Sequence, residues 1–144
     1  MRRYRFRLET VLRVRSLEEE GARVRLLEAN GAVTRARSGR DEAAGRYSGL
    51  PVFSGPCSVQ DFRGSRRREE MAAATLAARQ VALEQAGEAA EEARLGWMAA
   101  RGRVRVLERL DERRRAEHGL EVGRDEGRFL DDIGTTRHGM NDAD

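Results

Sequence analysis

The chain has 144 residues and a mass of 16.2 kDa, so one structural unit is expected rather than a catalytic domain with a separate regulatory domain. Charged residues make up 37% of the chain, which excludes a thick globular core. The 28 basic and 25 acidic residues leave a net charge of only +3, and such a mixture favours helices with solvated faces over disorder.

Every basic residue counted here is an arginine, because the sequence contains no lysine. The lone cysteine, Cys57, cannot form an intrachain disulfide bond. No apolar run approaches the roughly 20 residues of a transmembrane segment, and the N-terminus lacks the apolar stretch of a secretory signal. We therefore expect a cytoplasmic protein without a transmembrane segment.

The first predicted helix covers residues of about 7–47. Apolar residues recur there at alternating spacings of three and four, the heptad pattern of a coiled coil. The apolar members of this seam are Leu8, Leu12, Ala22, Leu26, Ala29, Val33, Ala36, Ala43 and Tyr47.

A loop of about 48–57 follows, because both prolines of the chain and two glycines lie between Gly49 and Pro56. Ser58 can then cap a new helix, since its hydroxyl can accept a first-turn amide while Asp61 places a carboxylate at the positive helix end. The second helix is predicted over about 59–133, with a flexible tail at 134–144. Its seam contains Ala72, Leu76, Leu83, Ala86, Ala90, Ala93, Trp97, Ala100, Val104 and Leu107, broken only by Arg79.

Two long helices joined by a short loop are expected to return antiparallel. The predicted fold is all-α: a long antiparallel two-helix coiled-coil hairpin with an overhanging C-terminal helix, forming a single domain over 1–144. A register that alternates large and small residues places Leu8 opposite Trp97 and Ala43 opposite Phe62. In that register the second helix overhangs the first from Met98 to about Ile133, and only Met1–Arg7 can cover the start of this stretch, so its apolar side chains are expected to contact a partner.

The sequence offers no support for catalysis. A phosphate-binding loop of the GxxxxGK[ST] type is impossible without lysine. His118, His138 and Cys57 do not have metal-ligand spacing, and the acidic pairs Asp111/Glu112 and Asp131/Asp132 are best read as solvated helix faces. We expect no enzyme activity, no metal and no cofactor.

Two basic runs, Arg66–Arg68 and Arg113–Arg115, could in principle contact nucleic acid. Acidic residues interrupt both runs, and the only aromatic residue nearby is Phe62, so nucleic-acid binding is not the favoured interpretation. Trp97 lies on the seam and is better explained by packing than by a binding hot spot.

Four stretches resemble the FliJ family of flagellar type III export proteins. They are FRLETVLRVRSLEEE from Phe6, WMAAR and VLERLDERR from Trp97 and Val106, and FLDDI from Phe129. The residues that carry the first motif are Phe6, Leu8, Val11, Leu12 and Arg15, and those of the second are Glu108, Leu110, Glu112 and Arg113.

The resemblance implies a non-catalytic coiled coil similar to the central stalk of rotary ATPases. Such a protein would bind the hexameric flagellar export ATPase and couple it to a membrane export gate protein and to export chaperones, in the cytoplasm at the inner membrane of the flagellar base. On this hypothesis Val104, Leu107 and Leu110 enter the ring, while Arg109, Arg113 and Arg114 pair with acids on its wall.

Two alternatives remain open from the sequence. One is a basic hairpin that binds nucleic acid or acidic lipid through Arg2–Arg7 and the arginine runs. The other is a generic scaffold coiled coil that oligomerises through exposed apolar residues. Neither alternative requires a catalytic residue.

Overall fold

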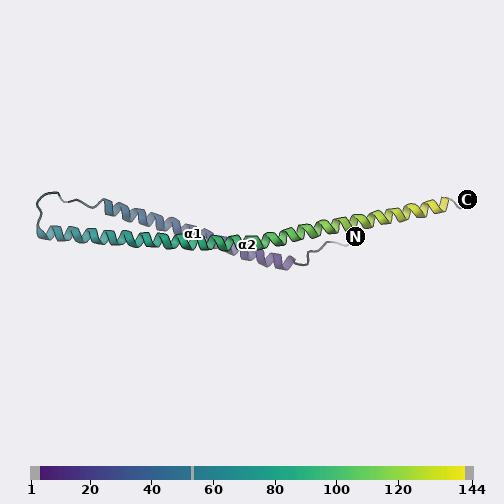
Figure 1. The fold of residues 1–144 in the computed structure, drawn as a ribbon, viewed down its shortest axis with the longest axis horizontal. Coiled ribbons are helices and arrows are strands. Elements are labelled where there is room, and N and C mark those ends of the chain that lie inside the picture. Colours follow the sequence, from purple (N-terminus) through teal and green to yellow (C-terminus); the bar gives the residue numbers. More distant parts are fainter. Residues whose placement is uncertain (1–3, 53, 142–144) are drawn as a thin grey trace. The chain divides into compact units, whose positions relative to one another are not determined.

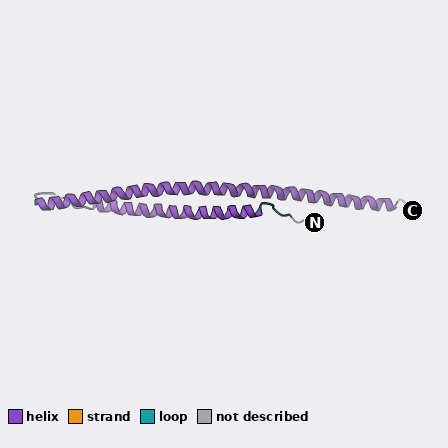
Figure 2. Ribbon diagram, turned by 90° about the horizontal axis from the view of Figure 1, so that it is seen from below, coloured by secondary structure: helices purple, strands orange, loops and turns teal. Residues whose placement is uncertain are grey.

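The computed structural model describes residues 4–52 and 54–141, with side chains over 4–52 and 54–129. This part of the chain forms two helices, α1 (Glu9–Ser48, 40 residues) and α2 (Val59–Asn141, 83 residues), joined by a loop (Figure 1). Figure 2 shows helices and loops and no strand among the described residues. The predicted all-α helical hairpin is confirmed, and its two arms are unequal in length.

The chain divides into two compact units. Unit 1 combines Met1–Leu17 with Arg101–Asp144, and unit 2 is Glu18–Ala100. Each unit contains a stretch of α1 and a stretch of α2. The sequence predicted one domain over 1–144, and the heptad pattern carried no sign of this division.

In unit 2, α1 ends where glycine and proline follow it. The Gly49 amide donates to the Gly45 carbonyl at 3.0 Å, and the Leu50 amide donates to the Tyr47 carbonyl at 3.3 Å. Pro51 has no amide hydrogen to continue the helical pattern. The loop then passes Gly55, whose φ of 117° lies in the left-handed region that glycine adopts without a steric penalty.

The predicted cap of α2 is confirmed in detail. The Asp61 amide donates to the Ser58 hydroxyl oxygen at 3.1 Å, and that hydroxyl donates to Asp61 Oδ2 at 2.6 Å. The helix therefore begins at Val59, with a carboxylate at the positive end of its dipole.

The predicted seams are confirmed by burial. Ala22 and Ala43 of α1 and Ala100 of α2 are buried in unit 2, and the seam positions between them are mostly half-buried, whereas Arg79 is exposed. The buried side chains are small, which lets two backbones approach closely without leaving voids.

The predicted register, in contrast, was wrong. Trp97 was expected opposite Leu8, but its indole Nε1 donates to Glu19 Oε1 at 2.8 Å. Gly39 of α1 and Arg79 of α2 lie beside each other in agreement with this shift, since a Cβ atom built on Gly39 would be 3.6 Å from Nη1 of Arg79. The faces of the helices follow from the heptads, whereas their offset along the axis does not.

The loop explains the error. Leu50, Pro51 and Val52 line one hollow together with Phe62, Ser65, Arg66, Arg68 and Glu69, so the loop lies beside the first turns of α2 (Figure 1). Extended chain advances about 3.3 Å per residue against about 1.5 Å in a helix, so a loop laid along a helix spans several turns. Phe62 consequently faces the loop and not Ala43.

In unit 1 the same shift covers residues that were predicted to be free. Val104 is only 3% exposed, and Leu107 and Leu110 are half-buried. The predicted start of the overhang at Met98 was therefore wrong. Tyr4, the first described residue, contacts Asp111 and His118, and α2 continues beyond them.

The predicted end of the second helix near residue 133 was also wrong, because α2 continues to Asn141. Of the predicted tail at 134–144, residues 142–144 lie outside the described residues.

Candidate functional site

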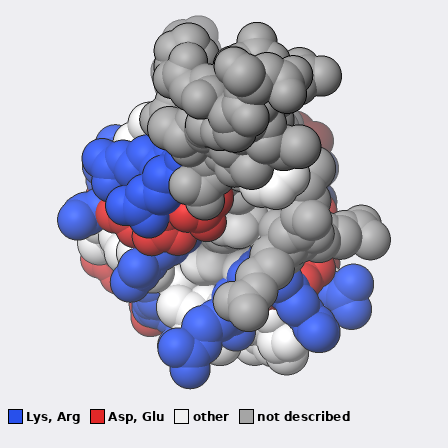
Figure 3. Space-filling model, turned by 90° about the vertical axis from the view of Figure 1, so that its right-hand side faces the viewer, with Lys and Arg blue, Asp and Glu red and all other residues white. Residues whose placement is uncertain are grey.

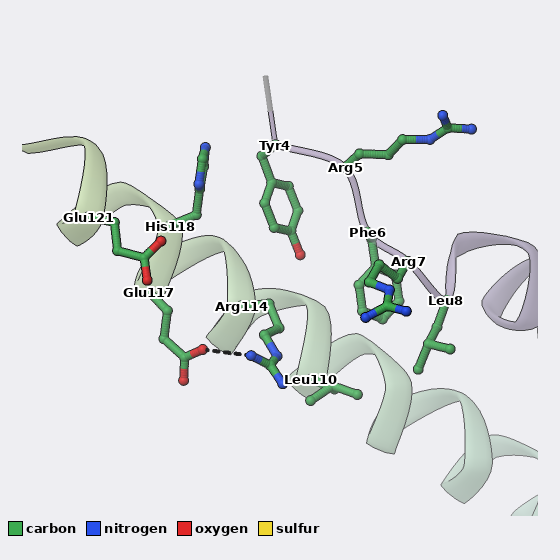
Figure 4. Close-up of a pocket in the computed structure, with 10 residues that line it drawn as sticks. All are labelled: Tyr4, Arg5, Phe6, Arg7, Leu8, Leu110, Arg114, Glu117, His118 and Glu121. Atoms are coloured by element: carbon green, nitrogen blue, oxygen red, sulfur yellow. Dashed lines mark hydrogen bonds and ion pairs between the residues drawn. The ribbon is translucent and has the colours of Figure 1, made fainter. Parts of the chain in front are cut away.

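Unit 1 contains an open groove between the N-terminal segment, Tyr4–Leu8, and α2. Figure 4 shows the Tyr4 ring extending toward α2, whereas Arg5 points away from it. The lining residues are Tyr4, Arg5, Phe6, Arg7, Leu8, Leu110, Arg114, Glu117, His118 and Glu121. Tyr4 to Phe6 are not helical, so side-chain contacts rather than helix formation hold this part of the chain beside α2.

Tyr4 makes the most specific of these contacts. Its hydroxyl donates to Asp111 Oδ1 at 2.7 Å and lies 3.3 Å from the Asp111 carbonyl oxygen. Arg115 Nη2 donates to the other carboxylate oxygen of Asp111 at 3.0 Å. The Arg115 guanidinium also lies 5.6 Å from the centre of the Tyr4 ring, within the range of a cation–π interaction.

His118 completes this cluster from the next turn of α2. Its ring centre lies 5.7 Å from that of Tyr4, and the two ring planes are inclined by 39°. Tilted aromatic pairs at this separation are attractive. We call Tyr4, Asp111, Arg115 and His118 the Tyr4 cluster.

The cluster raises the pKa of the Tyr4 phenol above its ordinary value of 10.0. Burial of the phenol is the largest cause, followed by the hydrogen bond to Asp111 and then by the negative charge of that carboxylate, whereas Arg115 and Arg114 act in the opposite direction. Tyr4 is therefore a neutral hydrogen-bond donor at physiological pH.

The described side chains of the groove do not form a metal-binding cluster. Over the described residues, no group of three or more His, Cys, Asp or Glu side chains is placed to hold a metal ion. The groove instead offers apolar side chains beside charged ones, as a protein contact surface does.

Charges on the helices pair mostly within one helix, three or four residues apart. Arg94 Nη2 lies 2.6 Å from Glu91 Oε1, and this hydrogen bond is the main cause that lowers the pKa of Glu91. Such exposed pairs contribute little to stability. On the face drawn in Figure 3, basic and acidic side chains lie close to one another, without a large area of one sign.

A comparison with protein families identifies the chain. The model of the flagellar FliJ protein matches residues 4–142, nearly the whole sequence. The chain belongs to the FliJ family. No curated protein and no solved structure gives a significant match.

FliJ-family membership makes this chain a flagellar export-related protein, and the family is a non-catalytic export component. None of the described helices contains an apolar stretch long enough to cross a membrane.

The first family motif lies partly in the hairpin interface of this FliJ-family chain. Phe6, Leu12 and Arg15 are half-buried, while Leu8 and Val11 are exposed at 37% and 43%. The motif thus combines packing residues with residues available to a partner.

The second motif lies on α2. Glu108 and Glu112 are exposed, and Leu110 lines the groove. Of the stretch from Phe129, the Phe129 side chain is exposed and the remaining side chains lie outside the described residues.

The residues predicted to contact a partner divide into four groups. Val104 is a core residue, so its predicted exposure was wrong, and Leu107 and Leu110 are partly covered. Arg113 and Arg114 both reach Glu117, at 3.2 Å and 3.4 Å. Arg109 is exposed.

Sequence reasoning missed the Tyr4 cluster. Asp111 and His118 were interpreted as solvated, and Tyr4 lies outside every heptad. A residue that precedes the first helix has no periodic signal, so only the register places it beside Asp111. The half-buried Asp111 side chain, 18% exposed, is the structural sign of that contact.

Proposed function

We propose that this FliJ-family chain is a non-catalytic stalk that binds the hexameric flagellar export ATPase. It couples that ATPase to the membrane export gate protein and to export chaperones, at the cytoplasmic side of the inner membrane at the flagellar base. The match of residues 4–142 to the FliJ family is the observation that carries this proposal.

The structure supports a docking role for the C-terminal half of α2. That helix continues from His118, beside Tyr4, to Asn141. On this stretch Leu120 and Phe129 are exposed at 65% and 67%. A partner that covers these two side chains removes their apolar surface from water, and this burial favours association.

The proposed contact surface therefore lies further along α2 than the sequence predicted. Leu120 and Phe129, nine residues apart and therefore on opposite sides of α2, supply its apolar contacts, as suits a partner that surrounds the helix. Leu107 and Leu110 contribute the side-chain surface that stays partly exposed. Arg109, Arg113 and Arg114 supply positive charge for acids on the ATPase. Val104 supports the hairpin from inside.

Binding of the purified export ATPase to the double variant L120D/F129D tests this proposal. Each buried large apolar side chain contributes about 1.5–3 kcal/mol, so the variant should bind more than about tenfold more weakly. The matched control is V81D/L95D, which changes two comparably exposed residues of α2 in unit 2.

Circular dichroism should show that both variants retain the wild-type helix content. Wild-type affinity in L120D/F129D, or an equal loss in V81D/L95D, would refute the proposed surface. Leu107 and Leu110 are poorer test sites, because aspartate there would also disturb the packing of unit 1.

A further inference from the structure

An exposed apolar surface lies in unit 2, where the loop runs beside the start of α2. We call it the loop-end patch: Tyr47, Leu50, Pro51, Val52, Val59 and Phe62. Val52 is 91% exposed, Val59 67% and Phe62 55%. All of its residues except Val59 line one open hollow, so they present a continuous surface.

The patch is not explained by the packing of the hairpin. Val52 lies in the loop, outside both heptad seams, and Phe62, which was predicted to pack opposite Ala43, is instead exposed. Apolar side chains gathered in this way usually mark an interaction site.

Three further arginines on the first turns of α2 add positive charge near this patch. Arg63, Arg67 and Arg68 form no ion pair within the described part of the chain, and Arg68 lines the same hollow as Val52. Arg66 is engaged, because its guanidinium reaches Glu69 at 3.5 Å and Glu70 at 3.8 Å.

The nearby acids offset this positive charge only in part. Glu69 and Glu70 pair with Arg66, and Asp61 accepts the Ser58 hydroxyl at the positive end of α2. Over residues 59–70 four arginines face three acids, which leaves a net charge of +1, and this sign fits an anionic partner surface.

We propose that the loop-end patch docks on an anionic phospholipid bilayer. Val52, Val59 and Phe62 enter the headgroup region, and Arg63, Arg67 and Arg68 contact lipid phosphates. Arginine suits this position because its apolar stem lies along apolar surface while its planar head donates several hydrogen bonds to phosphate.

The loop limits how deeply the patch can enter. Backbone groups outside a helix lack internal hydrogen-bond partners and cannot be transferred into the hydrocarbon core without a large cost. Contact is thus confined to the interface, and the binding is weak and reversible, as expected for a few apolar side chains together with basic residues. This proposal does not depend on the ATPase or on any other protein partner.

The native cysteine provides a probe at this surface. Cys57 is exposed, lies in the loop and is the only cysteine of the chain. A polarity-sensitive fluorophore on Cys57 of the full chain should shift to the blue with vesicles of mixed phosphatidylglycerol and phosphatidylcholine. Vesicles of phosphatidylcholine alone should cause little shift, and added salt should reverse the binding.

A second labelled protein locates the contact. In C57S/A99C the fluorophore is moved to exposed Ala99 of α2, and its emission should stay unchanged on the same anionic vesicles. A shift at residue 99 without a shift at residue 57 would overturn the proposal, because another surface would then bind the lipid.

Two double variants separate the two contributions, with vesicle sedimentation of unlabelled protein as the measurement. V52D/F62D and R67E/R68E should each weaken binding to anionic vesicles by about tenfold or more. Their matched controls, V81D/L95D and R101E/R105E, change exposed residues of the same types elsewhere on α2 and should bind as the wild type does.

Three results would overturn the proposal: no binding to anionic vesicles, equal binding to both lipid compositions, or equal loss in the control variants. The first would leave the patch as a surface for a protein. Equal binding to both lipid compositions would show that the arginines do not recognise lipid charge. Equal loss in the control variants would show that binding depends on the composition of the whole chain and not on this patch.

Discussion

Tyr4 shows how one residue outside a helix can be positioned by several weak contacts at once. Its hydroxyl reaches Asp111, its ring lies beside His118, and Arg115 contacts both the ring and the carboxylate. Each contact is weak by itself, and together they favour one arrangement of the N-terminal segment.

This cluster predicts a pH dependence at high pH. Because the folded-state pKa of Tyr4 is raised, the contribution of its neutral form to stability is fully present below about pH 10, the unfolded value, and is lost as pH rises through the folded value. Deprotonation removes the donor and places a phenolate beside the Asp111 carboxylate. The N-terminal segment should therefore detach from α2 in this range.

The absorbance of the phenolate measures this titration, and subtraction of the Y4F curve isolates Tyr4 from Tyr47. We expect a Tyr4 midpoint above 10.0, and a lower midpoint in D111N, where the carboxylate charge is absent. A Tyr4 midpoint at or below 10.0 would contradict the described cluster.

At the scale of elements, α2 forms one continuous helix although its C-terminal part contains several glycines. Gly119, Gly123 and Gly127 recur every four residues, and each costs about 1 kcal/mol of helix stability relative to alanine. A Cβ atom added at any of these three positions would meet nothing within 4 Å. The glycines are therefore not required for packing within the described part of unit 1.

Replacing these glycines tests whether they keep the end of α2 easy to unfold. G119A/G123A/G127A should raise the free energy of local unfolding by up to about 3 kcal/mol, because alanine lowers the entropy of the unfolded chain and favours the helix. Amide hydrogen exchange over 115–129 should slow accordingly.

The matched control is Gly49→Ala. A Cβ atom there would lie 3.1 Å from the Gly45 carbonyl oxygen, so alanine should not stabilise the end of α1. Unchanged exchange in the triple variant would show that another interaction controls the end of α2.

At the scale of the whole molecule, the decisive feature is the offset between the two arms. The contact between Glu19 and Trp97 defines this offset in unit 2, and the contact of Tyr4 with Asp111 defines it in unit 1. The offset buries Val104 and leaves Leu120 and Phe129 exposed on α2, so it decides which apolar residues a partner can reach.

Cysteine pairs test the offset directly. In a C57S background, E19C/W97C should be cross-linked efficiently by a short, flexible bis-maleimide, because the native side chains of these residues touch, whereas L8C/W97C, the pair of the predicted register, should not be. Electrophoresis after proteolysis detects the cross-link. Efficient cross-linking of L8C/W97C with none in E19C/W97C would restore the predicted register.

Much of this fold could be predicted from sequence, because heptads report directly which side of a helix is apolar. Ala22 and Ala43 are buried where the seam placed them, and Ser58 caps α2 as its spacing with Asp61 indicated. The family resemblance also followed from local motifs, and the match of residues 4–142 confirms it.

The sequence by itself determined that the chain forms helices, where they are interrupted, which faces pack and to which family the chain belongs, since these properties depend on residues near one another along the chain. Only the tertiary structure decided the register, the burial of Val104 and the position of Tyr4 beside Asp111. The physical reason is that a heptad seam repeats, so several offsets bury similar apolar area. The choice among them depends on where the loop lies and on individual contacts such as that of Trp97 with Glu19.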